Sequence, residues 1–233
     1  MFLYPRPPNP VARLFGRKAP PFDPYQYDRR TLQKVRLNRL RSGTRQICWT
    51  IDTDLTVNAG PDRQKQKAYL AGAIEAANYL DAPLIRFTLG GAKDDRAAYD
   101  RAVELMSSVL PVAIALHVKF AIENHGGLSG DPAVLAEFVQ HFHSPALGVC
   151  LDFGNFEGDR SIGMQTLAPH AIHVHAKARE FDAQGEETQI DYRMCLDVLK
   201  AVNYAGAISI EYEGDGDPAM GITRTRALIE KYG

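Results

Sequence analysis

Apolar runs of strand length recur along the chain and alternate with segments of helical periodicity. Six runs stand out as strand candidates: Gln46–Ile51, Leu84–Leu89, Val118–Glu123, Leu147–Asp152, Ala171–His175 and Ala207–Glu211. Nearly continuous apolar runs, without alternation, are typical of strands that are covered on both faces, as in a parallel sheet. The pattern therefore predicts an α/β protein built from repeated βα units.

The segments between these runs carry signals for the start of helices. An acidic N-cap followed by proline at the first helical position occurs at Asp131-Pro132 and at Asp217-Pro218. Helices are also expected to open at Asp62 and at Asp94 or Asp95, and to form over 191–202 and within 28–42.

The spacing of the strands favours an incomplete barrel. From residue 46 to residue 207 there are 161 residues in five steps, about 32 for each βα unit. A complete (β/α)8 barrel takes ~250 residues, and only 45 residues precede the first run. We therefore expect a TIM-barrel-like fold with about six clear βα units, incomplete at the N-terminus.

The start of the chain is a different kind of sequence from the rest. Seven of the 14 prolines fall in residues 1–24, and residues 1–45 hold 11 Lys and Arg against 2 Asp, whereas the remainder holds 16 Lys and Arg against 26 Asp and Glu. We predict an irregular, Pro-rich basic arm over 1–27 and a barrel domain over 28–233. The arm suits either a solvated extension or a nucleic-acid tail, and its prolines argue against an amphipathic transit peptide.

Composition excludes several classes of protein. Hydrophobic residues make up 45% and charged residues 24%, which is typical of a globular chain and not of a disordered chain, a collagen or a coiled coil. The longest apolar stretch, Leu110 to Leu116, is far shorter than the ~20 residues of a membrane span, so no membrane partner is expected. Three widely spaced cysteines, Cys48, Cys150 and Cys195, argue against a disulfide framework and favour the cytoplasm.

Four consecutive strand candidates end in a side chain that can bind a metal: Glu123, Asp152, His175 and Glu211. The carboxyl ends of parallel strands meet at one mouth of a barrel, where such folds build active sites. Three carboxylates there would repel one another, and one divalent ion, Mn²⁺, Mg²⁺, Co²⁺ or Zn²⁺, would neutralise them. Each residue alone has an ordinary explanation, as a helix cap, a core histidine or an ion-pair partner, but the joint pattern favours a metal site.

Four short segments around these residues carry a family resemblance. They are IENHGG (Ile122–Gly127), GVCLDFGNF (Gly148–Phe156), HVHAKA (His173–Ala178) and AISIEYEG (Ala207–Gly214). Together and in this order they resemble the sugar phosphate isomerase/epimerase family, within the xylose-isomerase-like TIM-barrel superfamily. The similarity covers roughly 28–233 and does not extend over the arm.

The resemblance implies a role for each matched residue. Glu123, Asp152, His175 and Glu211 match the metal ligands of the family, for which Mn²⁺ is the first expectation, and Glu123 and Glu211 also match the two acids that move the proton in its epimerases. Substrate contacts are expected from His125, Asn155, Lys177 and Arg179. Asn155 stands where relatives often have a histidine, and an amide cannot act as a base.

Two further strand residues carry an expectation. Arg86 lies inside an apolar run, and since a buried guanidinium needs a carboxylate partner, we predict that it braces Glu123. His173, two residues before His175, is expected to face the opposite side of its strand and pack against a helix.

The implied function is that of a divalent-metal-dependent sugar isomerase or epimerase in carbohydrate metabolism. It would act by proton transfer through a metal-bound enediolate on a ketose, an inosose or a related hydroxy-carbonyl compound; a dehydratase of the same superfamily would use the same chemistry. One alternative is an apurinic-site endonuclease-like DNA repair enzyme, which Asn155 and the acidic body disfavour. Another is a non-catalytic family member, for which the short N-terminus argues. We expect a small carbohydrate partner and no nucleic acid, and an open sheet edge would favour a homo-oligomer.

Overall fold

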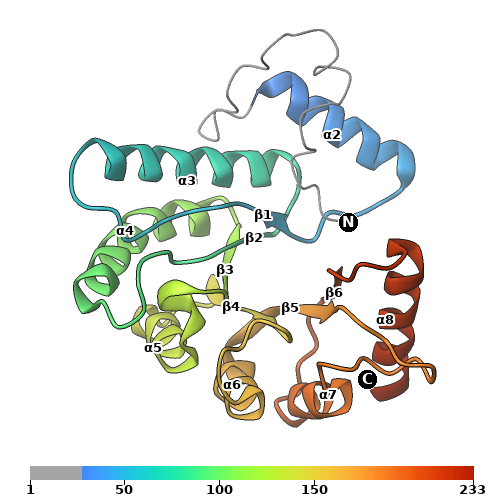
Figure 1. Ribbon diagram of the computed structural model, residues 1–233. Coiled ribbons are helices and arrows are strands. Elements are labelled where there is room, and N and C mark those ends of the chain that lie inside the picture. The colour runs from blue at the N-terminus through green and yellow to red at the C-terminus, as the bar shows by residue number, and fades with distance from the viewer. Residues whose placement is uncertain (1–27) are drawn as a thin grey trace, which may run out of the picture.

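A curled, parallel six-stranded sheet forms the centre of the computed structural model, which describes residues 28–233 (Figure 1). The strands are β1 (Trp49–Thr50), β2 (Leu84–Phe87), β3 (Lys119–Glu123), β4 (Leu147–Asp152), β5 (Ala171–Ala178) and β6 (Ile208–Tyr212). Each strand pairs in parallel with the next one along the chain. The expected α/β fold, a partial TIM barrel of six βα units, is confirmed. The predicted arm, 1–27, lies outside the described residues.

The observed strands differ from the expected runs at their ends. The first is only two residues long because, within 28–233, β1 has a hydrogen-bonded neighbour on one side alone, where Trp49 and Thr50 face β2. The fifth continues three residues past His175, because β6 supports it as far as the pair Ala178 and Tyr212. This extension brings Lys177 into the sheet.

Seven α-helices and two 3₁₀ turns connect the strands in the described part of the chain. They are α2 (Arg29–Ser42), α3 (Pro61–Tyr79), α4 (Arg96–Ala115), η1 (Gly127–Gly130), α5 (Pro132–Phe142), α6 (Arg160–Leu167), η2 (Ala168–His170), α7 (Tyr192–Ala201) and α8 (Pro218–Tyr232). In Figure 1 helices α3 to α7 follow the outer, convex side of the sheet.

Acidic N-caps start most of these helices, as the sequence indicates. The carboxylates of Asp131 and Asp217 accept hydrogen bonds from backbone N–H groups of the first turn, and each is followed by proline. Asp95, not Asp94, caps α4. The expectation for Asp62 is wrong: Gly60 is the N-cap, Pro61 takes the first position, and Asp62 lies within the first turn.

Alternation of side chains gives the sheet two different faces. Phe87 and Phe120 point outward into the main core against the helices, with ring centroids 5.1 Å apart in an edge-to-face arrangement. On the inner face Leu84, Ala121 and Cys150 form a small apolar layer. The polar side chains of the candidate site follow this layer toward the carboxyl ends of the strands.

Glycines let two loops at the mouth approach each other. Gly127 has φ +52°, and a Cβ there would lie 2.7 Å from the carbonyl oxygen of Gly90. The loops are also tied by hydrogen bonds, from the N–H of Leu128 to the Gly90 carbonyl (3.2 Å) and from the N–H of Leu89 to Ser129 Oγ (2.9 Å). The ends of β2 and β3 are thereby held together.

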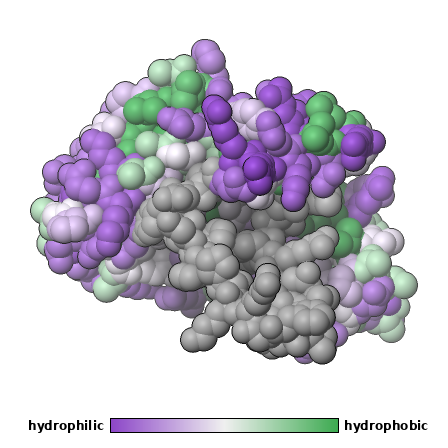
Figure 2. Space-filling view, turned by 90° about the horizontal axis from the view of Figure 1, so that it is seen from above, coloured by the Kyte–Doolittle hydropathy of each residue, from purple (hydrophilic) through white to green (hydrophobic). Residues whose placement is uncertain are grey.

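Over the described residues, no helix has the length and apolar character that crossing a membrane requires. On the face seen in Figure 2, the hydrophobic residues among 28–233 form small patches with hydrophilic residues between them. The predicted homo-oligomer stays a prediction.

Candidate metal centre

Four side chains from four successive strands converge at the carboxyl edge of the sheet. Glu123, Asp152, His175 and Glu211 each offer one ligand atom, and these atoms lie within 4.8 Å of one another. Nδ1 of His175 lies 2.7 Å from Glu123 Oε1, 3.2 Å from Glu211 Oε2 and 3.8 Å from Asp152 Oδ2. The structure thus brings together the four residues that the sequence singled out.

The donor atoms of this cluster fit a divalent cation. Glu123 Oε1 and Asp152 Oδ2 are buried carboxylate oxygens that accept no hydrogen bond from the described protein. Their nearest cationic partners are His175 and Lys177, and a divalent cation bound directly between the carboxylates would satisfy these oxygens. Three oxygens and one imidazole nitrogen are a ligand set that suits Mn²⁺, Mg²⁺, Co²⁺ or Zn²⁺.

Arg86 reaches the same cluster from β2. Its guanidinium forms an ion pair with Glu123 Oε2, the oxygen that does not face His175. His125, which is largely exposed, approaches the same oxygen with Nδ1 at 3.2 Å and lies 3.5 Å from Arg86. Arg86 and His125 therefore orient Glu123 through its Oε2, and its Oε1 is left to face the other members of the cluster.

Lys177 is the second cation of the cluster. Its ammonium lies 3.4 Å from Asp152 Oδ2, 3.1 Å from Glu211 Oε2 and 3.0 Å from Glu213 Oε1. Glu213 also pairs with Arg179 at 3.3 Å. Lys177 is buried and held by carboxylates, whereas Arg179 is partly exposed. Their predicted contacts to substrate stay predictions.

Burial and close charges shift the pKa values of the cluster in different directions. Burial opposes the charge of His175, but Cys150 and Glu211 outweigh it and raise the pKa of His175 to about 10. Burial likewise opposes the charge of Glu211, yet contacts with His175 hold the pKa of Glu211 below its usual range. Burial raises the pKa of Asp152 to about 6, with Lys177 acting in the opposite direction.

A family profile described as xylose isomerase-like TIM barrel matches residues 15–232. The chain belongs to this family. The resemblance drawn from the four motifs is confirmed.

Two curated proteins match part of this xylose isomerase-like barrel chain. The C-glycoside deglycosidase alpha subunit of Microbacterium trichothecenolyticum is 37% identical over 100 residues, 36% of this chain. An uncharacterised protein of Methanocaldococcus jannaschii is 26% identical over 178 residues, 69% of this chain. The matched stretches span only 27% and 59% of these two relatives.

Two solved structures share the fold. A D-tagatose 3-epimerase-like protein is 21% identical, with a TM-score of 0.71 over 88% of this chain and 83% of that chain. The IOLI protein, solved with a zinc atom bound, is 13% identical, with a TM-score of 0.71 over 87% of this chain and 83% of that chain. At identities this low, the similarity shows only that these proteins share the fold of this chain.

Asn124 is a buried residue of this family member that the sequence analysis missed. Its Nδ2 donates to the carbonyl oxygen of Asp152 (3.0 Å), and its Oδ1 accepts from the N–H of Asp152 (2.7 Å). The side chain therefore clamps the end of β3 to the end of β4 and fixes the backbone that carries Asp152. The signal was present: an amide directly after Glu123, where an apolar run ends.

Replacing Asn124 by alanine is expected to lower the free energy of unfolding by about 1–3 kcal/mol, because the Asp152 backbone groups are left buried without partners. Urea unfolding followed by circular dichroism measures this loss. Asn78→Ala is the matched control, since Asn78 makes one exposed hydrogen bond to the Leu116 carbonyl. Equal losses in the two variants would contradict the role of Asn124 as a clamp.

Asp152 and Asn155 are joined within the loop after β4. Asp152 Oδ1 accepts hydrogen bonds from the N–H groups of Gly154 (2.6 Å) and Asn155 (3.0 Å), which leaves Oδ2 toward the cluster. The side-chain Nδ2 of Asn155 is buried and has no hydrogen-bond partner among the described residues. This donor is the kind of group that a bound oxygen would satisfy, and the substrate contact of Asn155 stays a prediction.

The expectation for His173 is wrong. Side chains alternate along a strand, so residues two apart share a face, and His173 lies on the inner face together with His175. The two rings meet edge to face with centroids 5.3 Å apart, and Nε2 of His173 lies 3.0 Å from Ser209 Oγ. Burial, with His175 nearby, lowers the pKa of His173 to about 3, so the ring is neutral at pH 7.

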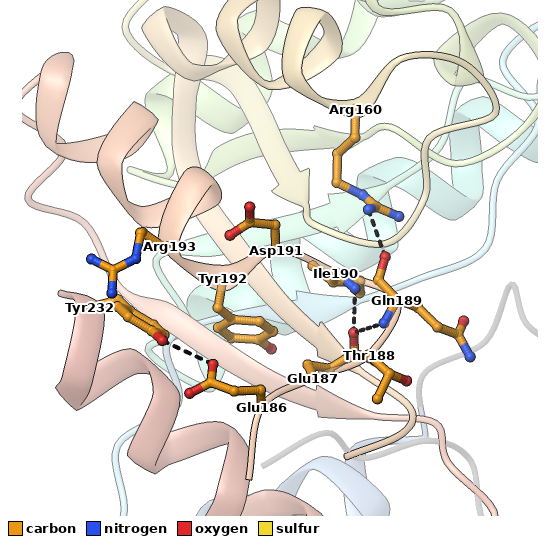
Figure 3. Close-up of a pocket in the computed structure, with 10 residues that line it drawn as sticks. All are labelled: Arg160, Glu186, Glu187, Thr188, Gln189, Ile190, Asp191, Tyr192, Arg193 and Tyr232. Atoms are coloured by element: carbon orange, nitrogen blue, oxygen red, sulfur yellow. Dashed lines mark hydrogen bonds between the residues drawn. The ribbon is translucent and has the colours of Figure 1, made fainter. Parts of the chain in front are cut away.

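A hollow of about 430 Å³ lies beside the segment that follows β5 (Figure 3). Its walls come from residues 186–193, Arg160 of α6 and Tyr232 of α8. The segment is folded around Glu187, whose carboxylate accepts N–H hydrogen bonds from Arg179 (3.1 Å) and Gln189 (2.7 Å), among others. No lining residue belongs to the cluster, so this hollow does not carry the chemistry of the site.

Proposed function

We propose that this protein is a divalent-metal-dependent sugar isomerase or epimerase. The observation that carries the proposal is the convergence of Glu123, Asp152, His175 and Glu211 within 4.8 Å, in a chain of the xylose isomerase-like barrel family. These four residues would hold one ion, with Mn²⁺ as the first expectation. A bound divalent cation would act as a Lewis acid on the carbonyl of a hydroxy-carbonyl substrate.

Glu123 and Glu211 supply the proton chemistry in this proposal. They reach the cluster from β3 and β6 and flank Nδ1 of His175, at 2.7 and 3.2 Å. One carboxylate would remove the proton from the carbon next to the carbonyl, and the other would return it to the opposite face or to the neighbouring carbon. Return to the opposite face gives epimerisation, and transfer between carbons gives aldose–ketose isomerisation.

Four residues are proposed to hold the substrate. His125 is exposed beside Glu123, and Asn155 offers a buried amide donor. Lys177 and Arg179 both form ion pairs with Glu213, which holds the two cationic groups close together. Both would donate hydrogen bonds to substrate oxygens. A small carbohydrate with adjacent hydroxyl and carbonyl groups fits such donors.

The proposal is tested by elemental analysis of the purified protein, followed by solvent-deuterium exchange into a panel of ketoses and inososes. One tightly bound divalent ion per chain and deuterium at the carbon next to a carbonyl are the expected results. About three ions per chain would favour an endonuclease-like enzyme. No ion and no exchange would favour a non-catalytic member of the family.

Mn²⁺ is expected to stabilise the wild-type protein and to have little effect on Asp152→Asn. An ion that binds only the folded state adds about 2.7 kcal/mol to its stability at a hundredfold excess over Kd. Thermal unfolding with EDTA and with Mn²⁺ measures the difference for each variant. Glu157→Gln, in the same loop but exposed, is the control that should respond like the wild type. A full Mn²⁺ response in Asp152→Asn would remove Asp152 from the ligand set.

We also propose a cytoplasmic location, since all three cysteines are free thiols in the structure and thiols persist in a reducing compartment.

A further inference from the structure

A second group of possible ligands lies on the inner face of the sheet, one step below the carboxylate cluster. Cys150, His173 and His175 each offer one ligand atom, and these atoms lie within 4.8 Å of one another. Cys150 is the register partner of His173 across β4 and β5, just as Asp152 is the register partner of His175. All three side chains are 2% exposed or less.

The chemistry of this group differs from that of the carboxylate cluster. A thiolate with two imidazoles prefers soft or borderline ions, whereas carboxylate oxygens suit Mg²⁺ and Mn²⁺. Three protein ligands also match the number in open zinc sites, where water takes the fourth position.

The ring of His173 is fixed by a hydrogen-bond partner on one nitrogen, as is common for histidines that bind metals. Its Nε2 lies 3.0 Å from Ser209 Oγ on β6, and its ring packs edge to face on His175. A hydrogen bond on one ring nitrogen fixes the orientation of the ring and presents the other nitrogen to an ion.

We propose that Cys150, His173 and His175 form a second metal site, selective for thiophilic divalent ions such as Cd²⁺ and Zn²⁺, that shares His175 with the carboxylate cluster. When the ion binds, the Cys150 S–H bond breaks, the sulfur lone pair forms the metal–sulfur bond and the proton goes to solvent. Because the imidazole of His175 belongs to both sites, an ion bound by Cys150 and His173 lowers the affinity of the carboxylate cluster for its own ion. This inference does not depend on any catalytic activity.

The test is a titration of EDTA-treated, full-length protein with Cd²⁺ in the presence of excess Mg²⁺, followed by the thiolate-to-cadmium absorption in the ultraviolet. Wild-type protein is expected to show this absorption with one Cd²⁺ per chain. Cys150→Ser should lose it. Cys195→Ser should keep it, and Cys195 is a matched control because it is equally buried but lies on α7. Absorption that persists in Cys150→Ser, or disappears equally in Cys195→Ser, would overturn the proposal.

His173→Asn gives a second readout if Cys150→Ser does not fold. The asparagine amide can still bond to Ser209, but it is a poor ligand for a soft ion, so Cd²⁺ affinity should fall at least about tenfold. Unchanged affinity would count against the site.

Sharing of His175 is tested with Mn²⁺ binding followed by electron paramagnetic resonance. Cd²⁺-loaded wild type should bind Mn²⁺ at least about tenfold more weakly than the Cd²⁺-free protein, and independent binding of the two ions would refute the sharing. Glu211→Gln separates this inference from the proposed function, because it removes a carboxylate ligand and should leave the Cd²⁺–thiolate absorption in place.

Discussion

Glu211→Gln is expected to lower turnover by about 10²–10⁴-fold, the contribution typical of a positioned acid or base, while the protein stays folded. Glutamine has nearly the shape of glutamate, but it cannot take a proton from carbon at neutral pH. Turnover is measured on whichever compound of the panel shows deuterium exchange, and circular dichroism checks the fold.

The pattern of exchange distinguishes a two-acid mechanism from a general loss of activity. If Glu123 and Glu211 serve opposite faces of the substrate carbon, Glu211→Gln should still exchange deuterium into one epimer and not into the other. Glu230→Gln is the control, since Glu230 lies on α8 in an exposed ion pair with Arg226. Full turnover in Glu211→Gln would remove this residue from the mechanism.

Arg86→Leu is expected to lower the free energy of unfolding of the metal-free protein by about 3–5 kcal/mol, because it removes the guanidinium that pairs with the buried carboxylate of Glu123. Glu123 is 0% exposed and Arg86 is 9% exposed, so water cannot replace the lost guanidinium. Chemical unfolding in EDTA measures the loss. The double variant Arg86→Leu with Glu123→Leu should recover much of it, since an apolar pair leaves no buried charge.

The matched control for this variant is Arg96→Leu. Arg96 and Glu137 are also an arginine–glutamate pair, with N and O 2.9 Å apart, but both side chains are more than half exposed. Exposed pairs contribute about 0–1 kcal/mol, so this loss should be small. If Arg86→Leu lowers the free energy of unfolding no more than Arg96→Leu does, the ion pair of Arg86 with Glu123 does not stabilise this region.

The parallel sheet explains why the sequence predicted the fold and the four converging residues. Continuous apolar runs marked the strands, and parallel strands bring their carboxyl ends to one edge, so Glu123 and Asp152 had to lie near each other. The short β1 was not predictable from its apolar run, because the length of an edge strand depends on its neighbours in space. The ion pairs of Lys177 with Asp152 and Glu211 were not predictable either, because they depend on how far β5 continues past His175; its contact with substrate stays a prediction.

Contacts made by single side chains were harder to predict than the elements that carry them. Asn124 and Glu187 both bind backbone groups. The position of Asn124 directly after Glu123 indicates a polar residue at the site, but the sequence does not identify the backbone groups that either side chain binds. The prediction for His173 was wrong for a different reason. Side chains alternate along a strand, so a residue two positions before His175 lies on the same face, and the sequence was enough to show this.

The order of the strands also sets how the proposed metal centre depends on each segment of the chain. Each strand pairs with the one that follows it in the chain, and Glu123, Asp152 and His175 lie on the three adjacent strands β3, β4 and β5. Glu211 alone comes from β6. Loss of β6 would therefore remove the fourth proposed ligand and the second proposed acid together, and would leave the other three proposed ligands on neighbouring strands.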